Sequence, residues 1–268
     1  MGPLSGRRAL VCGSTRGIGR ACAFEFARLG ARVTLLARDG EALQRVRDEL
    51  EAAEGAGAPG GAPRHEHLVA DFADPESVRA AVAPHIERTG PIEILLNNTG
   101  GPPAGPVFGA EPSEFLRAFS AHLVCNQILA ALLVPGMRRA GYGRVINVIS
   151  TSVKQPIPGL GVSNTIRGAV AAWSKTLAGE VAPFGITVNN ILPGATATER
   201  LRSLILSRAR AEGIDEAEME RRMKADIPLG RFARPEEIAS AVGYLATPDA
   251  GYISGVSLPV DGGRTSCL

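Results

Sequence analysis

The sequence is poor in the features that mark several classes of protein. Aromatic residues make up 4% of it, no long run of Lys or Arg interrupts it, and the formal net charge is only +2, so we expect no nucleic-acid partner. No cysteines show metal-ligand spacing; they are Cys12, Cys22, Cys125 and Cys267. We therefore expect no metal site and no oxidising compartment. The N-terminus lacks a signal-peptide pattern, and we expect a cytoplasmic protein.

Hydrophobic residues are plentiful enough for a large core. They make up 45% of the 268 residues, whereas charged residues make up 21%, so composition does not indicate disorder. One apolar stretch, Phe119–Met137, contains no Asp, Glu, Lys or Arg. It does contain Ser120, Asn126 and Gln127, which are costly in lipid. We expect a helix buried on a sheet or at a subunit interface, with no membrane partner.

Short apolar runs alternate with longer amphipathic segments along the chain. The expected strands are Arg8–Gly13, Ala31–Ala37, His65–Val69, Ile92–Leu96, Arg144–Ile149, Ile186–Leu192 and Ser257–Val260. The expected helices are Ile18–Leu29, Glu41–Ala53, Pro75–Arg88, Glu111–Arg139, Ser163–Val181 and Pro235–Leu245, with one or two more over Leu201–Lys224 and a loop over Glu54–Pro63. The pattern predicts one α/β domain over residues 1–268, a doubly wound Rossmann fold of about seven parallel strands with helices on both faces.

The first expected strand runs into a glycine-rich turn, and a helix follows. The turn consists of Gly13, Ser14, Thr15, Arg16, Gly17, Ile18 and Gly19. Glycine lets the backbone turn tightly and approach a pyrophosphate, and the start of the helix offers free N–H groups. An ordinary tight turn is the alternative, but the position in the first strand-helix unit favours dinucleotide binding.

The end of the second expected strand bears on which dinucleotide is bound. NAD-binding proteins usually place an acid there to hold the ribose hydroxyls, whereas this strand ends in Ala37 followed by Arg38. Arg38 and Arg16 can clamp a 2′-phosphate through charge-assisted hydrogen bonds. We therefore expect NADP(H) in preference to NAD(H). The alternatives are that both arginines face solvent or that Asp39 supplies the acid.

Five short motifs stand in order at the ends of expected strands. They are the Gly13/Gly17/Gly19 turn, Asp71-Phe72, Asn97-Asn98-Thr99-Gly100, Pro193-Gly194 with Thr198, and Val260-Asp261-Gly262-Gly263. Together they resemble the short-chain dehydrogenase/reductase family from Arg8 to Gly263. The resemblance implies that Asp71 and Phe72 border the adenine and that Asn98 and Gly100 border the cofactor. It also implies that Pro193, Gly194 and Thr198 hold the nicotinamide end, and that the chain forms a homotetramer or homodimer.

The positions that the family uses for catalysis differ in this chain. Members of the family commonly use Asn, Ser, Tyr and Lys, with Tyr as general acid/base. The resemblance places Ser150 at the serine position, Ser163 and Arg167 at the Tyr and Lys positions, and His122 at the Asn position. Arg167 keeps a fixed charge and can still bind the nicotinamide ribose. His122 can replace the lost acid, directly or through water, because imidazole titrates near neutral pH; the alternative is a hydrogen-bonded buried histidine.

Three functions remain open at this point. We expect an NADP(H)-dependent oxidoreductase that transfers hydride between nicotinamide and a small carbonyl/alcohol substrate, with a non-standard proton donor. The alternatives are a catalytically silent NADP(H)-binding protein and a non-redox dehydratase or isomerase on the same scaffold. Lys154 is expected either to contact substrate or to be solvated, and residues 196–228 to form a helical lid that includes Arg200.

Overall fold

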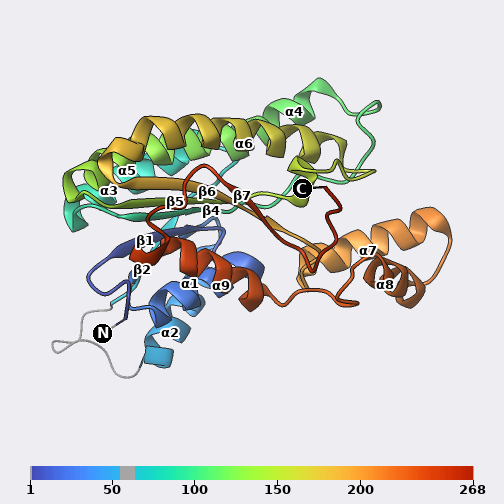
Figure 1. The fold of residues 1–268 in the computed structure, drawn as a ribbon, viewed down its shortest axis with the longest axis horizontal. Coiled ribbons are helices and arrows are strands. Elements are labelled where there is room, and N and C mark those ends of the chain that lie inside the picture. Colours follow the sequence, from blue (N-terminus) through green and yellow to red (C-terminus); the bar gives the residue numbers. More distant parts are fainter. Residues whose placement is uncertain (1, 55–63, 268) are drawn as a thin grey trace.

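The computed structural model describes residues 2–54 and 64–267. The loop expected over Glu54–Pro63 therefore lies, beyond Glu54, outside the described residues. Figure 1 shows a central sheet between two layers of helices, with a helical hairpin projecting beyond one end of the sheet. The arrangement confirms the expected single-domain doubly wound fold.

Seven parallel strands make up the sheet within the described ranges. Their order is β3-β2-β1-β4-β5-β6-β7. The strands are β1 (Arg8–Cys12), β2 (Arg32–Ala37), β3 (Glu66–Val69), β4 (Ile94–Asn97), β5 (Gly143–Val148), β6 (Ile186–Pro193) and β7 (Ser257–Val260). The order reverses between β1 and β4, which is where doubly wound folds bind their ligands.

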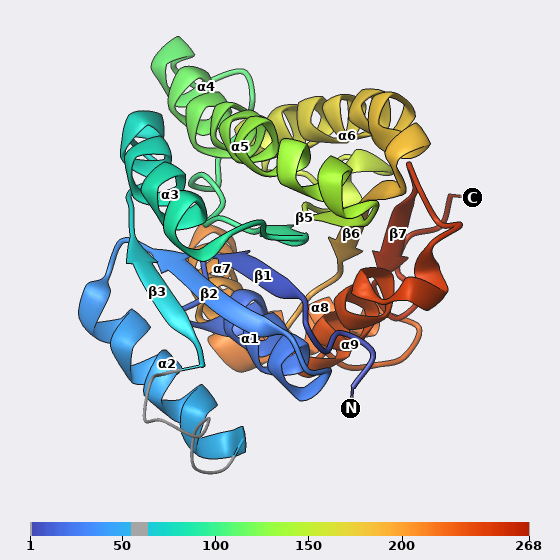
Figure 2. The ribbon, with the colours of Figure 1, turned by 90° about the vertical axis from the view of Figure 1, so that its left-hand side faces the viewer.

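Helices cover both faces of the sheet, as Figure 2 shows. One face carries α1 (Gly17–Arg28), α2 (Gly40–Glu54) and α9 (Pro235–Ala246), and the other carries α3 (Pro75–Thr89), α4 (Pro112–Phe119), α5 (Cys125–Ala140) and α6 (Gly161–Val181). Neighbouring strand residues enter opposite cores: Leu35 packs on the first side and Leu36 on the second. The central strands are mainly apolar because both of their faces are buried.

The remaining two helices, α7 (Glu199–Glu212) and α8 (Glu216–Ala225), form the projecting hairpin. The sequence pattern had left open whether this segment holds one helix or two. The hairpin has a small core of its own, in which Leu201, Ile205, Ala209 and Met219 are buried. It lies at the carboxyl ends of the strands, beside the site described below.

The apolar helix expected over Glu111–Arg139 is continuous but not regular. A π-helical turn, Ser120–Val124, joins α4 to α5. By length and composition, Pro112–Ala140 is apolar enough to cross a membrane, since its most apolar 18-residue window has a mean hydropathy of 1.6. In the structure α5 packs on β4, β5 and α3, and 44% of the most apolar window is buried. These contacts agree with the expectation of a helix packed on the sheet.

A row of polar side chains crosses four neighbouring strands of the sheet. Asn97, Asn147, Asn190 and Ser257 are register partners on β4 to β7. Asn97 Nδ2 donates to Asn147 Oδ1 at 2.8 Å, and Asn147 Nδ2 donates to Asn190 Oδ1 at 3.0 Å and to Ser174 Oγ at 3.2 Å. Asn147 is fully buried, so its amide satisfies polar groups that water does not reach. The row fixes the strand ends that carry the site.

Replacing Asn147 by Ala should lower the free energy of unfolding by about 2–4 kcal/mol, since buried amide groups of Asn97 and Asn190 each lose a partner at about 1–3 kcal/mol. Ser174→Ala is the matched control. It removes one hydrogen bond from the same network, and we expect a loss of about 1 kcal/mol. Urea unfolding of both variants checks this. Equal losses for the two variants would contradict the role given to the row.

Candidate active site

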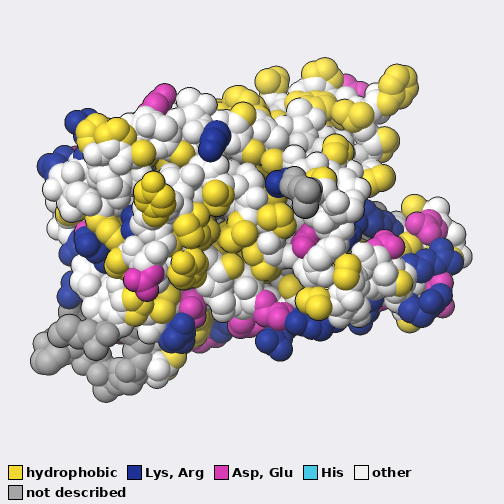
Figure 3. Space-filling view, in the orientation of Figure 1, with side chains coloured by type: hydrophobic (Ala, Val, Ile, Leu, Met, Phe, Trp, Pro, Cys, Tyr) yellow, Lys and Arg dark blue, Asp and Glu magenta, His cyan; other side chains and the backbone are white. Residues whose placement is uncertain are grey.

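A cleft of about 1070 Å³ opens at the carboxyl ends of the central strands. Its walls come from the turns after β1 to β6, from α6 and from α7. Figure 3 shows the molecule hollowed between its upper part and the α7–α8 hairpin, with many Lys and Arg side chains on the hairpin side. The cleft includes the point between β1 and β4 where the strand order reverses.

The glycine-rich turn after β1 has the geometry of a phosphate cradle. Gly13 and Gly17 have φ angles of 61° and 55°, which residues with a Cβ rarely adopt. A Cβ on Gly19 would lie 2.1 Å from the Gly13 carbonyl oxygen. Asn98 closes the turn from β4, because its Nδ2 donates to the carbonyl oxygens of Cys12 and Gly13. The residues present therefore fit a dinucleotide pyrophosphate at the start of α1.

Most of the residues expected to bind the cofactor face the cleft. Those that line it are Gly13, Thr15, Arg16, Gly17, Ile18, Arg38, Asp71, Phe72, Asn98, Gly100, Arg167, Pro193, Gly194 and Thr198. Ser14 and Gly19 do not line it. Ser14 is fully buried, and its Oγ accepts a hydrogen bond from the Leu36 N–H at 3.1 Å. Ser14 therefore joins β1 to β2, and both residues support the turn from behind.

Two cationic side chains face the cleft, one after β2 and one in the turn after β1. Ala37 and Arg38 line it, whereas Asp39 does not. The Asp39 carboxylate instead accepts a hydrogen bond from the Ala42 N–H at 3.0 Å, near the start of α2. Arg16 forms an ion pair with Glu199, the first residue of α7, and both side chains are more than 70% exposed. These positions leave Arg16 and Arg38 as the groups suited to a 2′-phosphate.

Three of the four residues expected at the reacting centre face the same cleft. Ser150 lies at the end of β5, and its Oγ accepts a hydrogen bond from the Ser152 N–H at 3.1 Å. Ser163 and Arg167 lie in the first two turns of α6 and both line the cleft. Because they are four residues apart, they share one face of the helix.

No tyrosine, lysine or histidine occurs among the described residues that line the cleft. The chain has three tyrosines. Tyr142 is buried and its hydroxyl donates to the Ala246 carbonyl, while Tyr244 and Tyr252 are exposed away from the cleft. Lys154 is exposed and also lies outside the lining. Ser163 and Arg167 thus present a hydroxyl and a guanidinium to the cleft.

Arg167 places a buried charge at the centre of this group. Arg167 is only 8% exposed, and its Nη1 donates a hydrogen bond to the Val148 carbonyl at 2.9 Å. Burial, and then the charge of Arg200, lower the pKa of Arg167 to about 10. The guanidinium therefore remains charged at neutral pH. Arg200 itself donates from Nη2 to the Pro102 carbonyl at 2.6 Å.

His122 lies behind the wall of the cleft, in the π-helical turn. It is 3% exposed, and the neighbouring Ala121 lines the cleft instead. Its Nδ1 lies 2.5 Å from Thr99 Oγ1. Burial, and then the charge of Arg167, lower the pKa of His122 to about 3. A hydrogen bond with the Gly100 backbone acts in the opposite direction and raises the pKa, but it is the smaller effect. The expectation that His122 titrates near neutral pH is therefore wrong, because burial of the ring disfavours its charged form.

The pKa of His122 has a consequence for stability. Its pKa of about 3 in the folded chain lies below the ordinary value of 6.5. Below pH 6.5 the unfolded chain therefore binds more protons than the folded chain, and the free energy of unfolding decreases as the pH is lowered. Relative to His122→Asn, the wild type should lose about 2 kcal/mol between pH 7 and pH 5. Urea unfolding at the two pH values checks this. His67→Asn is the control, and it should still show most of the decrease in the free energy of unfolding between pH 7 and pH 5. A wild type and a His122→Asn variant with the same pH dependence would contradict the neutral, buried state.

Several lining residues were not among the expected site residues. Arg264, Ile157 and Leu160 reach the cleft from segments far apart in the sequence, and no local pattern marks them. Arg200 was recognised only as one of several arginines in the lid. Its position two residues after Thr198 is the signal that could have placed it at the cleft.

Comparison with known proteins gives the family. A family model described as Enoyl-(Acyl carrier protein) reductase matches residues 13–265. The chain is 34% identical over 265 residues to 3-oxoacyl-(acyl-carrier-protein) reductase FabG of Pseudomonas aeruginosa, covering 97% of this chain and 98% of that protein. It is similar to L-sorbose reductase from Gluconobacter frateurii complexed with NADPH and L-sorbose, with a TM-score of 0.91, 32% identity and full coverage of both chains.

A variant of actinorhodin polyketide ketoreductase solved with NADPH is also similar, with a TM-score of 0.88 and 29% identity over 99% of this chain and all of that one. The match extends across the cofactor cradle, the strand ends and α6. The chain therefore belongs to the short-chain dehydrogenase/reductase family, a family of NAD(P)-dependent oxidoreductases.

Proposed function

We propose that the protein is an NADP(H)-dependent oxidoreductase that transfers hydride between nicotinamide and a carbonyl/alcohol substrate without a phenolic proton donor. The observation that carries this proposal is that Ser150, Ser163 and Arg167 face the same cleft as the phosphate cradle. The similarity to L-sorbose reductase and actinorhodin ketoreductase, both solved with NADPH, supports the choice of cofactor.

The cleft offers a group for each part of the cofactor. The turn from Gly13 to Gly19 would hold the pyrophosphate, and Arg16 and Arg38 would hold the 2′-phosphate. Pro193, Gly194 and Thr198, with Arg167, would hold the nicotinamide end. The bound nicotinamide supplies or accepts the hydride.

The chain's own side chains would act on the substrate oxygen. As a carbonyl is reduced, negative charge grows on its oxygen, and a fixed donor in a water-poor site stabilises that charge strongly. Arg167 is such a donor, since it is buried and charged, and Ser150 adds a hydroxyl. Ser163 would donate its hydroxyl proton to the oxygen and take another from water. Neutral His122 would position this region through its hydrogen bond with Thr99.

Consumption of NADPH with a panel of aldehydes, ketones and keto acyl thioesters tests the proposal. We expect NADPH to be oxidised with at least one class of carbonyl compound. Tight NADPH binding without turnover of any of them would instead indicate a silent nucleotide-binding protein. Conversion of a substrate without net change in NADPH would indicate a dehydratase or isomerase.

We further propose that the chain is cytoplasmic and assembles as a homotetramer or homodimer. Leu116 and Phe119 of α4 are 71% and 41% exposed, and an apolar helix face left open in one chain favours a partner. On the same side, the Trp173 indole N–H of α6 donates to Gln127 of α5 at 2.8 Å. Size-exclusion chromatography with light scattering checks the assembly, and a monomer at micromolar concentration would contradict it.

A further inference from the structure

Two guanidinium groups meet in the cleft without an acid between them. A Cβ on Gly101 would lie 3.7 Å from Nη2 of both Arg167 and Arg200, so the two groups face the same point beside the loop after β4. Among the described residues, neither arginine has a carboxylate within ion-pair distance. Because Arg167 is almost fully buried, its charge is costly unless a ligand compensates it.

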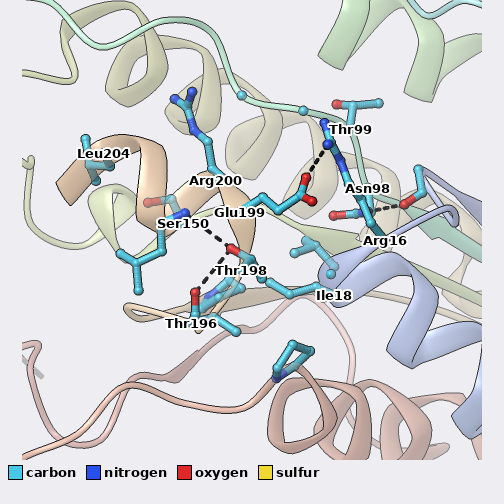
Figure 4. Close-up of a pocket in the computed structure, with 18 of the residues that line it drawn as sticks. Arg16, Ile18, Asn98, Thr99, Ser150, Thr196, Thr198, Glu199, Arg200 and Leu204 are labelled. Atoms are coloured by element: carbon cyan, nitrogen blue, oxygen red, sulfur yellow. Dashed lines mark hydrogen bonds and ion pairs between the residues drawn. The ribbon is translucent and has the colours of Figure 1, made fainter. Parts of the chain in front are cut away.

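The acids that line the cleft are engaged or placed elsewhere. Glu199 follows Thr198 and precedes Arg200, but it pairs with Arg16 of the phosphate turn. Figure 4 shows the two neighbours on α7 diverging, with Glu199 directed to Arg16 and Arg200 directed to the loop after β4. Asp226 lies near Arg208, whose pKa it influences. The positive charge beside Gly101 is therefore not neutralised by the protein.

The surroundings of the two arginines narrow the class of ligand. Ile157, Leu160 and Leu204 line the same cleft and offer an apolar wall, which suits a hydrocarbon body. The pyrophosphate cradle is a separate group of residues around Gly13 and Gly17, and it borders Thr198. A cofactor phosphate would be held by that turn and by Arg16 and Arg38. The anion that suits Arg200 is therefore one carried by the substrate.

We propose that Arg200, together with Arg167, binds a carboxylate of the substrate close to the reacting oxygen, so that the enzyme acts on keto acids or hydroxy acids. This rests on the proposed hydride-transfer function and adds the substrate class to it. Arg200 is held ready by its hydrogen bond to the Pro102 carbonyl. A guanidinium can bind a carboxylate through two parallel hydrogen bonds, which gives orientation as well as affinity.

Binding of benzoate to the NADPH-saturated protein tests the subsite, with benzamide as the neutral probe of the same shape. Thermal shift over a range of concentrations gives the dissociation constant of each. We expect the wild type to prefer benzoate over benzamide, and Arg200→Gln to weaken benzoate binding by at least about tenfold with little effect on benzamide. Arg202→Gln is the matched control, since Arg202 lies on the same helix, outside the cleft, and pairs with Glu216.

Equal binding of benzoate and benzamide to the wild type, or no benzoate binding, would overturn the subsite. So would unchanged benzoate binding in Arg200→Gln. Arg200→Lys keeps the charge but loses the paired donors, so it should recover only part of the affinity. A loss of NADPH binding in Arg200→Gln without loss of benzoate binding would assign Arg200 to the cofactor instead. If no carbonyl compound is reduced while benzoate still binds through Arg200, the hydride-transfer proposal fails and the anion site stands.

Discussion

Replacing Arg167 by Met should lower kcat/KM for carbonyl reduction by about a thousandfold, because removing a preorganised donor from a buried site costs about 100- to 1000-fold. The loss should fall mainly on kcat, since the charge that Arg167 stabilises grows as the substrate oxygen takes up the electrons. Steady-state kinetics with NADPH and the best carbonyl substrate of the panel measure it. A loss confined to KM for NADPH would restrict Arg167 to holding the ribose.

The same substitution should not weaken the fold. Arg167 is buried and has a single backbone acceptor, the Val148 carbonyl, and an apolar side chain of similar length removes an uncompensated charge. We expect Arg167→Met to unfold at the same or a higher temperature than the wild type. Arg167→Lys keeps the charge and should recover activity to within about tenfold of the wild type. A marked loss of stability in Arg167→Met would show that its effect on activity is merely structural.

Replacing both Arg16 and Arg38 by Ala should weaken NADPH binding by about 100- to 1000-fold, because two charge-assisted hydrogen-bond donors to the 2′-phosphate are removed. NADH lacks this phosphate, so its affinity should change by less than about threefold. Isothermal titration or fluorescence titration of both dinucleotides gives the ratio of affinities.

Arg32→Ala is the control for this prediction. Arg32 is exposed at the start of β2, the strand that ends before Arg38, and it does not line the cleft. It should leave both affinities unchanged. Glu199→Gln should strengthen NADPH binding modestly, because Arg16 then has no ion pair with Glu199 to lose when the dinucleotide binds. Parallel losses of NADPH and NADH affinity in the double variant would contradict the assignment of these arginines to the 2′-phosphate.

The fold was predictable from local pattern because burial on both faces leaves a plain signature. Strands such as Ile94–Asn97 are apolar up to their last residue, and most are followed by a helix. The cradle was predictable too, since positive φ at Gly13 and Gly17 requires a residue type that the sequence displays directly. The register of Ser163 and Arg167 on one face of α6 follows from helical spacing alone.

What the sequence could not supply was the environment of individual charges. His122 is an ordinary histidine in the sequence, but the π-helical turn directs it to Thr99 and burial beside Arg167 keeps it neutral. Arg200 is one of several arginines in the lid, and only the fold brings it to the same point as Arg167. Contacts between segments so distant in the chain produce no periodic pattern in the sequence from which they could be predicted.

These two environments change how the reacting centre is understood. A neutral His122 is a poor general acid, so the proposed mechanism assigns stabilisation of the substrate oxygen to Arg167 and Ser150. A fixed cation favours reactions in which charge collects on oxygen before the proton arrives. The proposed function therefore depends on hydride transfer taking place in a cleft whose described lining holds guanidinium groups but no Tyr or Lys.

The most direct test of that central claim uses NADPH carrying deuterium at the transferable position of its nicotinamide. The wild-type protein is incubated with the carbonyl substrate, and mass spectrometry measures deuterium in the alcohol. The account predicts one deuterium on the former carbonyl carbon, at a rate that falls by about a thousandfold in Arg167→Met. Product without deuterium, or NADPH bound tightly with no product, would contradict it.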